Sequence, residues 1–231
     1  MIAIFMFIIL IVFVLLGAPI SMAMAIGALA AIKYSGLDPV IIPSLISGGM
    51  SNYTLMAIPF FIFLGNIMNS GGITERIFDW CEALVGHMKG SLAQVNVVTS
   101  VVFAAISGTA VANAAGLGML GVKAMKSKGY DGKFSTGVTV AASLLGPIIP
   151  PSVVLLVFGS LSNTSPGKLF MAGLLPGLVL AAILMAQIYF MCVTGKVKCP
   201  EPEKFSLKRL IHATKRSIFA LLCPVLLFLG V

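Results

Sequence analysis

The fold is decided by residues 91–125, SLAQVNVVTSVVFAAISGTAVANAAGLGMLGVKAM, an apolar run without a charge before its last three residues. Its middle holds Ser-Gly-Thr at 107–109, the least helix-like tripeptide in the run, so the pattern predicts two short helices that meet there. Residues 92–106 make about 22 Å of helix, less than the roughly 30 Å hydrocarbon core of a membrane. We therefore expect residues 91–126 to enter a bilayer without crossing it, as a re-entrant helical hairpin.

A second break is expected further along the chain. Residues 134–160 carry no charge and are long enough to span a membrane, but GPIIPPS interrupts them at 146–152. Proline donates no amide hydrogen and disfavours helical geometry in the residue before it, so carbonyl groups are left without partners near the bilayer midplane. Lipid cannot satisfy such groups, and helix breaks at this depth are where transporters bind ions and substrates. Residues 133–163 are thus a predicted proline-broken transmembrane helix.

Composition places the whole chain in a membrane. Apolar residues make up 59% of the sequence, only 10% of residues are charged, and the mean hydropathy is +1.09. A soluble domain would carry about 25% charged residues. The net charge of +8 resides in short loops between apolar runs, so it indicates orientation and not nucleic-acid binding. Four cysteines lack CxxC or Cys/His metal spacing, which favours neither a disulfide nor a zinc site. They are Cys81, Cys192, Cys199 and Cys223.

Several segments together resemble one transporter family. They are AIPFFIFLGNIMNSGGITER at 57–76, LVGHMKG at 84–90, ISGTAVA at 106–112, Ala124-Met125 with Gly-Tyr-Asp at 129–131, and GPIIPPS at 146–152. In this order they resemble the large membrane subunit of the tripartite ATP-independent periplasmic (TRAP) transporters. Asn113 departs from the family, in which we expect Asp more often, so no ionised side chain is assumed there. The chain is also about half as long as the family's large subunit.

The resemblance implies an all-α polytopic membrane protein that forms half of an inverted-repeat, elevator-type transporter. Its activity would be sodium-driven import of small organic acids of the C4-dicarboxylate or sialic-acid type across the bacterial inner membrane. Its partners would be a small membrane subunit and a periplasmic substrate-binding protein. The coupling ion would be sodium, with no other cofactor.

The pattern predicts a first transport repeat over residues 1–193. Its parts are a broken N-terminal helix pair hinged at Pro19 (1–32), a transmembrane helix (54–70), an amphipathic interfacial helix (74–89) with Thr74 as N-cap, the hairpin (91–126), the broken helix (133–163) and a transmembrane helix (168–193). Residues 194–217 form a predicted basic cytoplasmic linker, and 218–231 begin a second repeat. The family resemblance implies that helix 74–89 is an arm that braces the moving part of the transporter against its fixed part. A surface connector fits the residues of this helix equally well.

Basic residues set the predicted orientation. Lys89 and a lysine cluster from Lys123 to Lys133 flank a hairpin that does not cross, so both of its ends lie on one face, and the positive-inside rule makes that face cytoplasmic. The broken helix then leads to the periplasm near residues 162–168. The next transmembrane helix returns to the cytoplasm.

Both breaks carry the residue types that suit a small cation and an anionic substrate. Serine and threonine hydroxyls and freed carbonyls are the hard oxygen ligands that sodium prefers, glycine permits close approach of the backbone, and a new helix N-terminus attracts a carboxylate. The candidate binding residues are Ser107, Gly108, Thr109, Ala110, Asn113, Gly146, Pro147, Pro150, Pro151 and Ser152. Ser107, Thr109, Gly146 and Ser152 are the predicted sodium ligands. Tight packing of small residues is the alternative interpretation, and for Asn113 both stay open.

Other function classes fit less well. An intramembrane enzyme needs acid, base or nucleophile partners within its spans, and no apolar span here contains Asp, Glu or His, so we expect no catalytic residue. A passive channel with a re-entrant loop is an alternative, and so is a fragment that transports nothing. Dependence of flux on a soluble binding protein separates a transporter from a channel.

Overall fold

The computed structural model describes residues 1–38, 40–51, 53–202 and 204–229, and within these ranges every regular element is a helix. The predicted all-α class is thus confirmed at the level of secondary structure. The chain divides into two compact units, Met1–Asn52 and Tyr53–Val231. Each unit has its own packing.

The first unit contains α1 (Ile2–Leu15), α2 (Ile20–Tyr34) and α3 (Ile41–Met50). The break between α1 and α2 confirms the predicted hinge, because Pro19 directly precedes α2 and Gly17 adopts a positive φ of 85° in the turn. The helices α1 and α2 pack closely, and a Cβ atom at Gly27 would lie 3.2 Å from the carbonyl oxygen of Met6. Glycine at 27 therefore allows the two backbones to approach.

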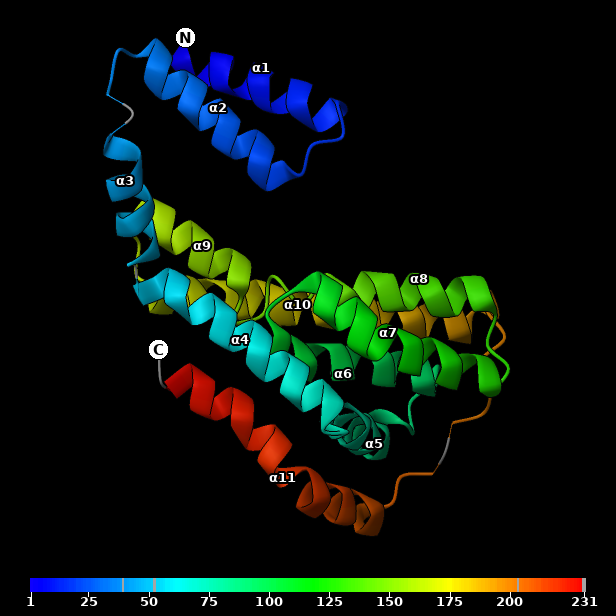
Figure 1. The fold of residues 1–231 in the computed structure, drawn as a ribbon. Helices are drawn as coiled ribbons and strands as arrows, with labels where there is room; N and C mark the ends of the chain where they lie inside the picture. Colours follow the sequence, from blue (N-terminus) through cyan, green and yellow to red (C-terminus); the bar gives the residue numbers. More distant parts are fainter. Residues whose placement is uncertain (39, 52, 203, 230–231) are drawn as a thin grey trace. The chain divides into compact units, whose positions relative to one another are not determined.

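The second unit is a helical bundle built around α6. Its elements are α4 (Tyr53–Ser70), α5 (Ile73–Val85), α6 (Ser91–Ser107), α7 (Ala110–Ser127), α8 (Gly132–Ser143), α9 (Val153–Ser162), α10 (Pro166–Val193) and α11 (Leu207–Leu229). Helix α6 contacts α4, α5, α7, α8, α10 and α11, and Figure 1 shows it in the middle of this unit. Most of its residues are buried, including the polar side chains of Gln94, Asn96 and Thr99.

Helix α10 supports the second break. Within the described ranges it is the one helix long and apolar enough to cross a membrane by itself, and several shorter apolar helices accompany it. Two glycines on α10 lie against the loop that follows α8. A Cβ atom at Gly173 would lie 2.8 Å from the carbonyl oxygen of Ile148, and one at Gly177 would lie 2.6 Å from the Ile149 side chain. The two glycines on α10 thus allow the loop between α8 and α9 to pack closely against this helix.

Helix α5 differs in detail from its prediction. It begins at Ile73 and ends at Val85, four residues before the predicted end at 89. The prediction of Thr74 as N-cap was wrong, because Gly72 holds the cap position with φ 67°, and Thr74 is buried inside the first turn. Glycine adopts this left-handed conformation without the steric cost that a Cβ atom brings.

The predicted boundary at residues 217/218 does not coincide with a helix end. Helix α11 runs continuously from the basic segment into the apolar one, and its first part packs on α5. Trp80 Nε1 donates to Thr214 Oγ1 at 3.0 Å, and Ser217 Oγ donates to the carbonyl of Arg76 at 2.9 Å. The surface of α5 therefore continues the helix across the composition change.

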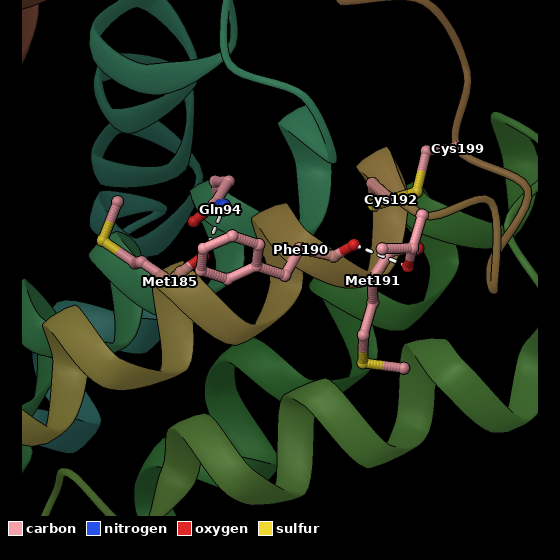
Figure 2. Close-up of a disulfide and its surroundings, with 7 residues drawn as sticks. Gln94, Met185, Phe190, Met191, Cys192 and Cys199 are labelled. Atoms are coloured by element: carbon pink, nitrogen blue, oxygen red, sulfur yellow. Dashed lines mark hydrogen bonds between the residues drawn. A yellow bond between two sulfur atoms is a disulfide. The ribbon is translucent and has the colours of Figure 1, made fainter.

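A disulfide joins Cys192 to Cys199, with Cα atoms 5.8 Å apart, so the expectation that favoured no disulfide was wrong. Figure 2 shows Cys192 near the end of α10 and Cys199 on the chain that returns to it. The return needs a turn just after α10, and Gly195 supplies one with φ 70°. Folding of this turn brings the two thiols together, which their sequence spacing alone did not reveal.

Candidate functional site

The first helix break lies at residues 107–109, as predicted. Helix α6 ends at Ser107, Gly108 adopts a left-handed conformation with φ 61°, and Thr109 is extended before α7 begins at Ala110. The Gly108 amide donates to the Ala104 carbonyl at 2.9 Å, as at other helix ends that close with glycine. Thr109 Oγ1 accepts from the Ala112 amide at 3.2 Å and so caps α7.

The second break separates α8 from α9 and also matches its prediction. Ser152 organises this loop, because its Oγ donates to the Pro147 carbonyl at 2.7 Å and accepts from the Leu155 amide at 3.3 Å. Ser152 is thereby the N-cap of α9. The Pro150–Pro151 peptide bond is cis. One hydroxyl thus closes the loop and starts the next helix.

The two breaks contact each other directly. The Val153 amide donates to the Gly108 carbonyl at 3.1 Å. A Cβ atom at Gly108 would lie 2.7 Å from the Pro151 carbonyl oxygen, and one at Gly146 would lie 2.5 Å from the Thr109 carbonyl oxygen. Real Cβ atoms do not approach backbone that closely, so glycine is required on both sides of the contact. The first turns of α7 and α9 therefore begin at one place, and their partial positive charges add there.

Two polar atoms near the breaks have no hydrogen-bond partner among the described residues. One is Oγ of Ser107, whose residue is 3% exposed, and the other is Oδ1 of Asn113. Leaving a buried polar atom unsatisfied costs about 1–3 kcal/mol, so a bound species that accepts or coordinates it would be stabilising. The hydroxyls of Thr109 and Ser152 differ in this respect, because both already serve as helix caps.

A cavity of about 270 Å³ adjoins the first break. Helices α4, α6 and α7 form its walls, and Ser107 and Thr109 are the two predicted site residues that line it. Its other lining residues are Ile62, Gly65, Asn66, Phe103, Val111, Ala112, Ala115 and Gly116. Of these, the small residues Ala112, Ala115 and Gly116 recur at helical spacing on α7. Asn66 on α4 is an amide within an apolar helix, a residue type that serves a helix-to-helix hydrogen bond more often than transport.

Asn113 does not line this cavity. Its Nδ2 donates to the Ser100 carbonyl at 3.3 Å, so its side chain faces α6. The structure thus brings Ser107, Gly108, Thr109 and Ala110 together with Gly146, Pro147, Pro151 and Ser152, and sets Asn113 one turn further into α7. Its unpartnered Oδ1 belongs to the buried polar interior between α6 and α7.

The interior between α6, α7 and α8 contains a polar contact that the sequence did not indicate. Asn96 Nδ2 donates to Thr139 Oγ1 at 2.6 Å, and both side chains are buried. A Cβ atom at Gly121 would lie 2.9 Å from Asn96 Oδ1, so glycine makes room for the amide. This contact fixes α8, which carries the second break, against the hairpin.

Among the described residues no three His, Cys, Asp or Glu side chains gather as metal ligands. The arrangement at the breaks offers neutral oxygen atoms and helix N-termini. Its chemistry therefore suits recognition of a small hard cation and of an anion, and the atoms available for each differ. Hydroxyl and carbonyl oxygens suit the cation, and amide hydrogens at the first turns suit the anion.

The sequence is similar to those of known proteins. A family described as "Tripartite ATP-independent periplasmic transporter, DctM component" matches residues 7–231. The sialic acid TRAP transporter large permease protein SiaM of Vibrio cholerae is 44% identical over 185 residues, which are 80% of this chain and 43% of that protein. The C4-dicarboxylate TRAP transporter large permease protein DctM of Pseudomonas aeruginosa is 39% identical over 78% of this chain and 42% of its own length.

A third relative extends the match. The 2,3-diketo-L-gulonate TRAP transporter large permease protein YiaN of Escherichia coli is 35% identical over 216 residues, which are 93% of this chain and 50% of that protein. The chain thus spans about half the length of the curated relatives it matches.

Proposed function

The chain belongs to the DctM family of tripartite ATP-independent periplasmic transporters, and on this premise we propose that it forms part of a sodium-coupled importer of small organic acids. The contact between the two helix breaks is the proposed site. The import would proceed by an elevator-type movement in the bacterial inner membrane. A periplasmic substrate-binding protein and a small membrane subunit are the proposed partners.

The observation that carries this proposal is the unpartnered Ser107 hydroxyl beside the cavity that adjoins the first break. Most buried polar atoms in folded proteins are hydrogen-bonded, so an unsatisfied hydroxyl beside a cavity favours a bound partner over tight packing alone. A sodium ion coordinated by Ser107 Oγ would satisfy it, and carbonyl oxygens of the break loops would complete the coordination. Thr109 and Ser152 would then hold the loops in shape through their caps.

Helix lengths support a position for the site at mid-depth in the membrane. Helix α8 has 12 residues, about 18 Å, and it starts next to the lysine-rich connection that we place at the cytoplasmic surface. One leaflet of the hydrocarbon core is about 15 Å thick. The loop after α8 would therefore lie near the bilayer midplane, the depth at which discontinuous helices hold substrate in many transporters.

The substrate class follows from the anion-binding character of the site. The N-termini of α7 and α9 start at the contact, and their dipoles favour a carboxylate. The relatives named above for sialic acid, a C4-dicarboxylate and 2,3-diketo-L-gulonate all have acidic substrates by name. The cavity of about 270 Å³ is slightly below the usual range for a complete ligand pocket, as expected if further walls come from outside this chain.

The test is Ser107→Ala in the full-length permease, reconstituted with both partners in liposomes. The substitution removes a buried atom that has no partner, so thermal stability should stay the same or rise slightly. Sodium-dependent uptake of a panel of carboxylic acids should need at least tenfold more sodium. Ser127→Ala is the matched control, because its hydroxyl bonds only to the Ala124 carbonyl at the exposed end of α7.

Unchanged sodium dependence in Ser107→Ala would refute the ion site. Uptake that proceeds equally without the binding protein would point to a channel instead. A loss of thermal stability without a change in sodium dependence would assign Ser107 to packing.

A further inference from the structure

A surface groove of about 980 Å³ runs along the outer side of α8. Figure 1 shows α7 and α8 side by side, with the connection between them at one end of the bundle. The groove starts at this connection and follows α8 toward the second break. It is lined by Lys126, Asp131, Gly132, Lys133, Thr136, Gly137, Val140, Ala141 and Leu144.

The end of the groove at the connection is basic. Lys126 reaches across the start of α8, since a Cβ atom at Gly132 would lie 3.1 Å from its Cε and 3.7 Å from its Nζ. Lys133 is exposed in the first turn of α8. The Asp131 carboxylate caps that helix by accepting from the amides of Lys133 and Phe134 at 2.9 and 3.2 Å. Two ammonium groups thus flank one carboxylate that is already engaged, which leaves a net positive charge.

The other end of the groove is apolar and open. Val140 and Leu144 are 56% and 53% exposed. No atom lies within 4 Å of the place where a Cβ at Gly137 would sit, so Gly137 leaves a hollow in the helix surface. Gly137 and Ala141 also line a second cavity of about 200 Å³ toward α6 and α10. Apolar hollows therefore adjoin both sides of α8.

The spacing between the two ends matches a lipid. Val140 and Leu144 follow Lys133 by seven and eleven residues, which is about 10 and 17 Å along the helix. A single leaflet of the hydrocarbon core is about 15 Å thick. A positive group at the surface, followed by an apolar channel of that length, complements an anionic headgroup with its acyl chain.

We propose that this groove binds a phospholipid with an anionic headgroup. Its phosphate lies between the ammonium groups of Lys126 and Lys133, and an acyl chain covers Gly137, Val140 and Leu144. The bound lipid would hold the α7–α8 connection at the membrane surface, and with it the two helices that begin or end at the breaks.

The chemistry recognised at the basic end is a phosphate monoanion, which a lipid or free inorganic phosphate can supply. The apolar end distinguishes them, because only a lipid gains from it. Each lysine near an anionic surface contributes about a fivefold gain in affinity, so the loss of both should weaken binding about thirtyfold.

The experiment measures lipid binding to the purified full-length permease by native mass spectrometry, with phosphatidylglycerol and phosphatidylcholine of the same acyl chains as probes. The wild type should bind phosphatidylglycerol more tightly. The double variant K126Q/K133Q should lose this preference about thirtyfold. K204Q/K208Q removes the same charge elsewhere in the chain and should retain it.

Gly137→Leu tests the apolar end. A Cβ atom at this exposed position has open space around it, so the fold should keep its melting temperature while affinity for both lipids falls. Gly48→Leu is the matched control, because Gly48 is also a helical glycine with open space at its Cβ position, and lipid affinity should not change.

Three results would overturn the proposal. One is equal affinity of wild type and K126Q/K133Q for phosphatidylglycerol. Another is unchanged lipid binding by Gly137→Leu. The third is displacement of the lipid by millimolar inorganic phosphate, which would show an anion site that the acyl chains do not use. None of them bears on sodium-dependent uptake, so this proposal and the proposed function fail independently.

Discussion

Arg209 Nη2 lies 2.9 Å from Glu82 Oε2, and this ion pair joins α11 to α5 across 127 positions of sequence. Both side chains retain contact with solvent, at 46% and 19% exposure, so the pair contributes little by itself. The two hydrogen bonds beside it, from Trp80 and from Ser217, are more protected. Together the three contacts fix the register of α11 on α5.

We predict that Glu82→Gln lowers the free energy of unfolding by less than about 1 kcal/mol, since exposed ion pairs rarely contribute more. Trp80→Phe should cost more, about 1–3 kcal/mol, because it removes the donor to Thr214 and part of the packing. Thermal unfolding in detergent measures the cost of each substitution. The single variant Arg209→Gln and the double variant Glu82→Gln/Arg209→Gln complete a double-mutant cycle for the ion pair. Equal costs would show that the hydrogen bond to Thr214 does not matter.

Alanine substitution should destabilise the fold at two glycines and stabilise it at a third. Gly108→Ala combines a left-handed backbone with a Cβ that would overlap the Pro151 carbonyl, so we expect a loss of more than about 2 kcal/mol. Gly146→Ala should be similarly severe through its overlap with Thr109. Gly137→Ala should stabilise by about 0.5–1 kcal/mol, as alanine in a helix with open space. Melting temperatures of the three purified variants test this order, and a mild Gly108→Ala would disprove the interlock.

The Asn96–Thr139 hydrogen bond gives a third prediction. Thr139→Val leaves the buried Asn96 amide without its acceptor, at an expected cost of about 1–3 kcal/mol. Gly121→Ala should also destabilise, by forcing a Cβ against Asn96 Oδ1. Asn96→Ala should rescue Gly121→Ala, because it removes the atoms that the new methyl group meets. Failure of that rescue in thermal unfolding would assign the cost of Gly121→Ala to another contact.

Thiol reactivity should separate the cysteines. Burial raises the pKa of Cys81, on the predicted interfacial helix α5, to about 12, so its thiol stays protonated at pH 8. We expect alkylation of Cys81 to be slower by about three orders of magnitude than that of an exposed thiol, until the protein is unfolded. Mass spectrometry in a Cys223→Ser background measures the rates. Fast labelling of Cys81 in the folded protein would contradict its burial.

The same labelling reports the side of the membrane. The predicted orientation places Cys192 and Cys199 at the cytoplasmic end of α10, where cellular thiols keep such pairs reduced. The fold places the two sulfur atoms within bonding distance, so the compartment decides whether the bond persists. On the predicted cytoplasmic side we expect free thiols in cells, and the disulfide after oxidation of the purified protein by glutathione disulfide. An intact disulfide in freshly lysed, alkylated cells would place this end of α10 in the periplasm.

The breaks were predictable because their causes are local. Gly108 and the prolines at 147, 150 and 151 act on their own backbone, so the sequence near them is sufficient to end a helix. The direct contact between the two breaks, the Val153–Gly108 hydrogen bond, pairs residues far apart in sequence and could not be predicted from either segment alone. The predicted ion and substrate roles of these residues remain predictions.

Features that depend on partners distant in sequence were missed. The composition change near Ser217 predicted a boundary, yet packing on α5 keeps α11 helical through it. Thr74 was predicted to be the N-cap of α5, but Gly72 holds that position. The Cys192–Cys199 disulfide depends on the direction of the turn after α10, which the spacing of the cysteines does not predict.

The contact between the two breaks is formed by main-chain atoms. The Val153 amide donates to the Gly108 carbonyl, and Gly108 and Gly146 allow the two backbones to approach. Such a joint does not depend on which side chains surround it. Residues that face the cavity can therefore be substituted during evolution while the main-chain contact between the two breaks is kept. The joint can therefore persist through substitutions that alter the shape and polarity of the cavity beside it.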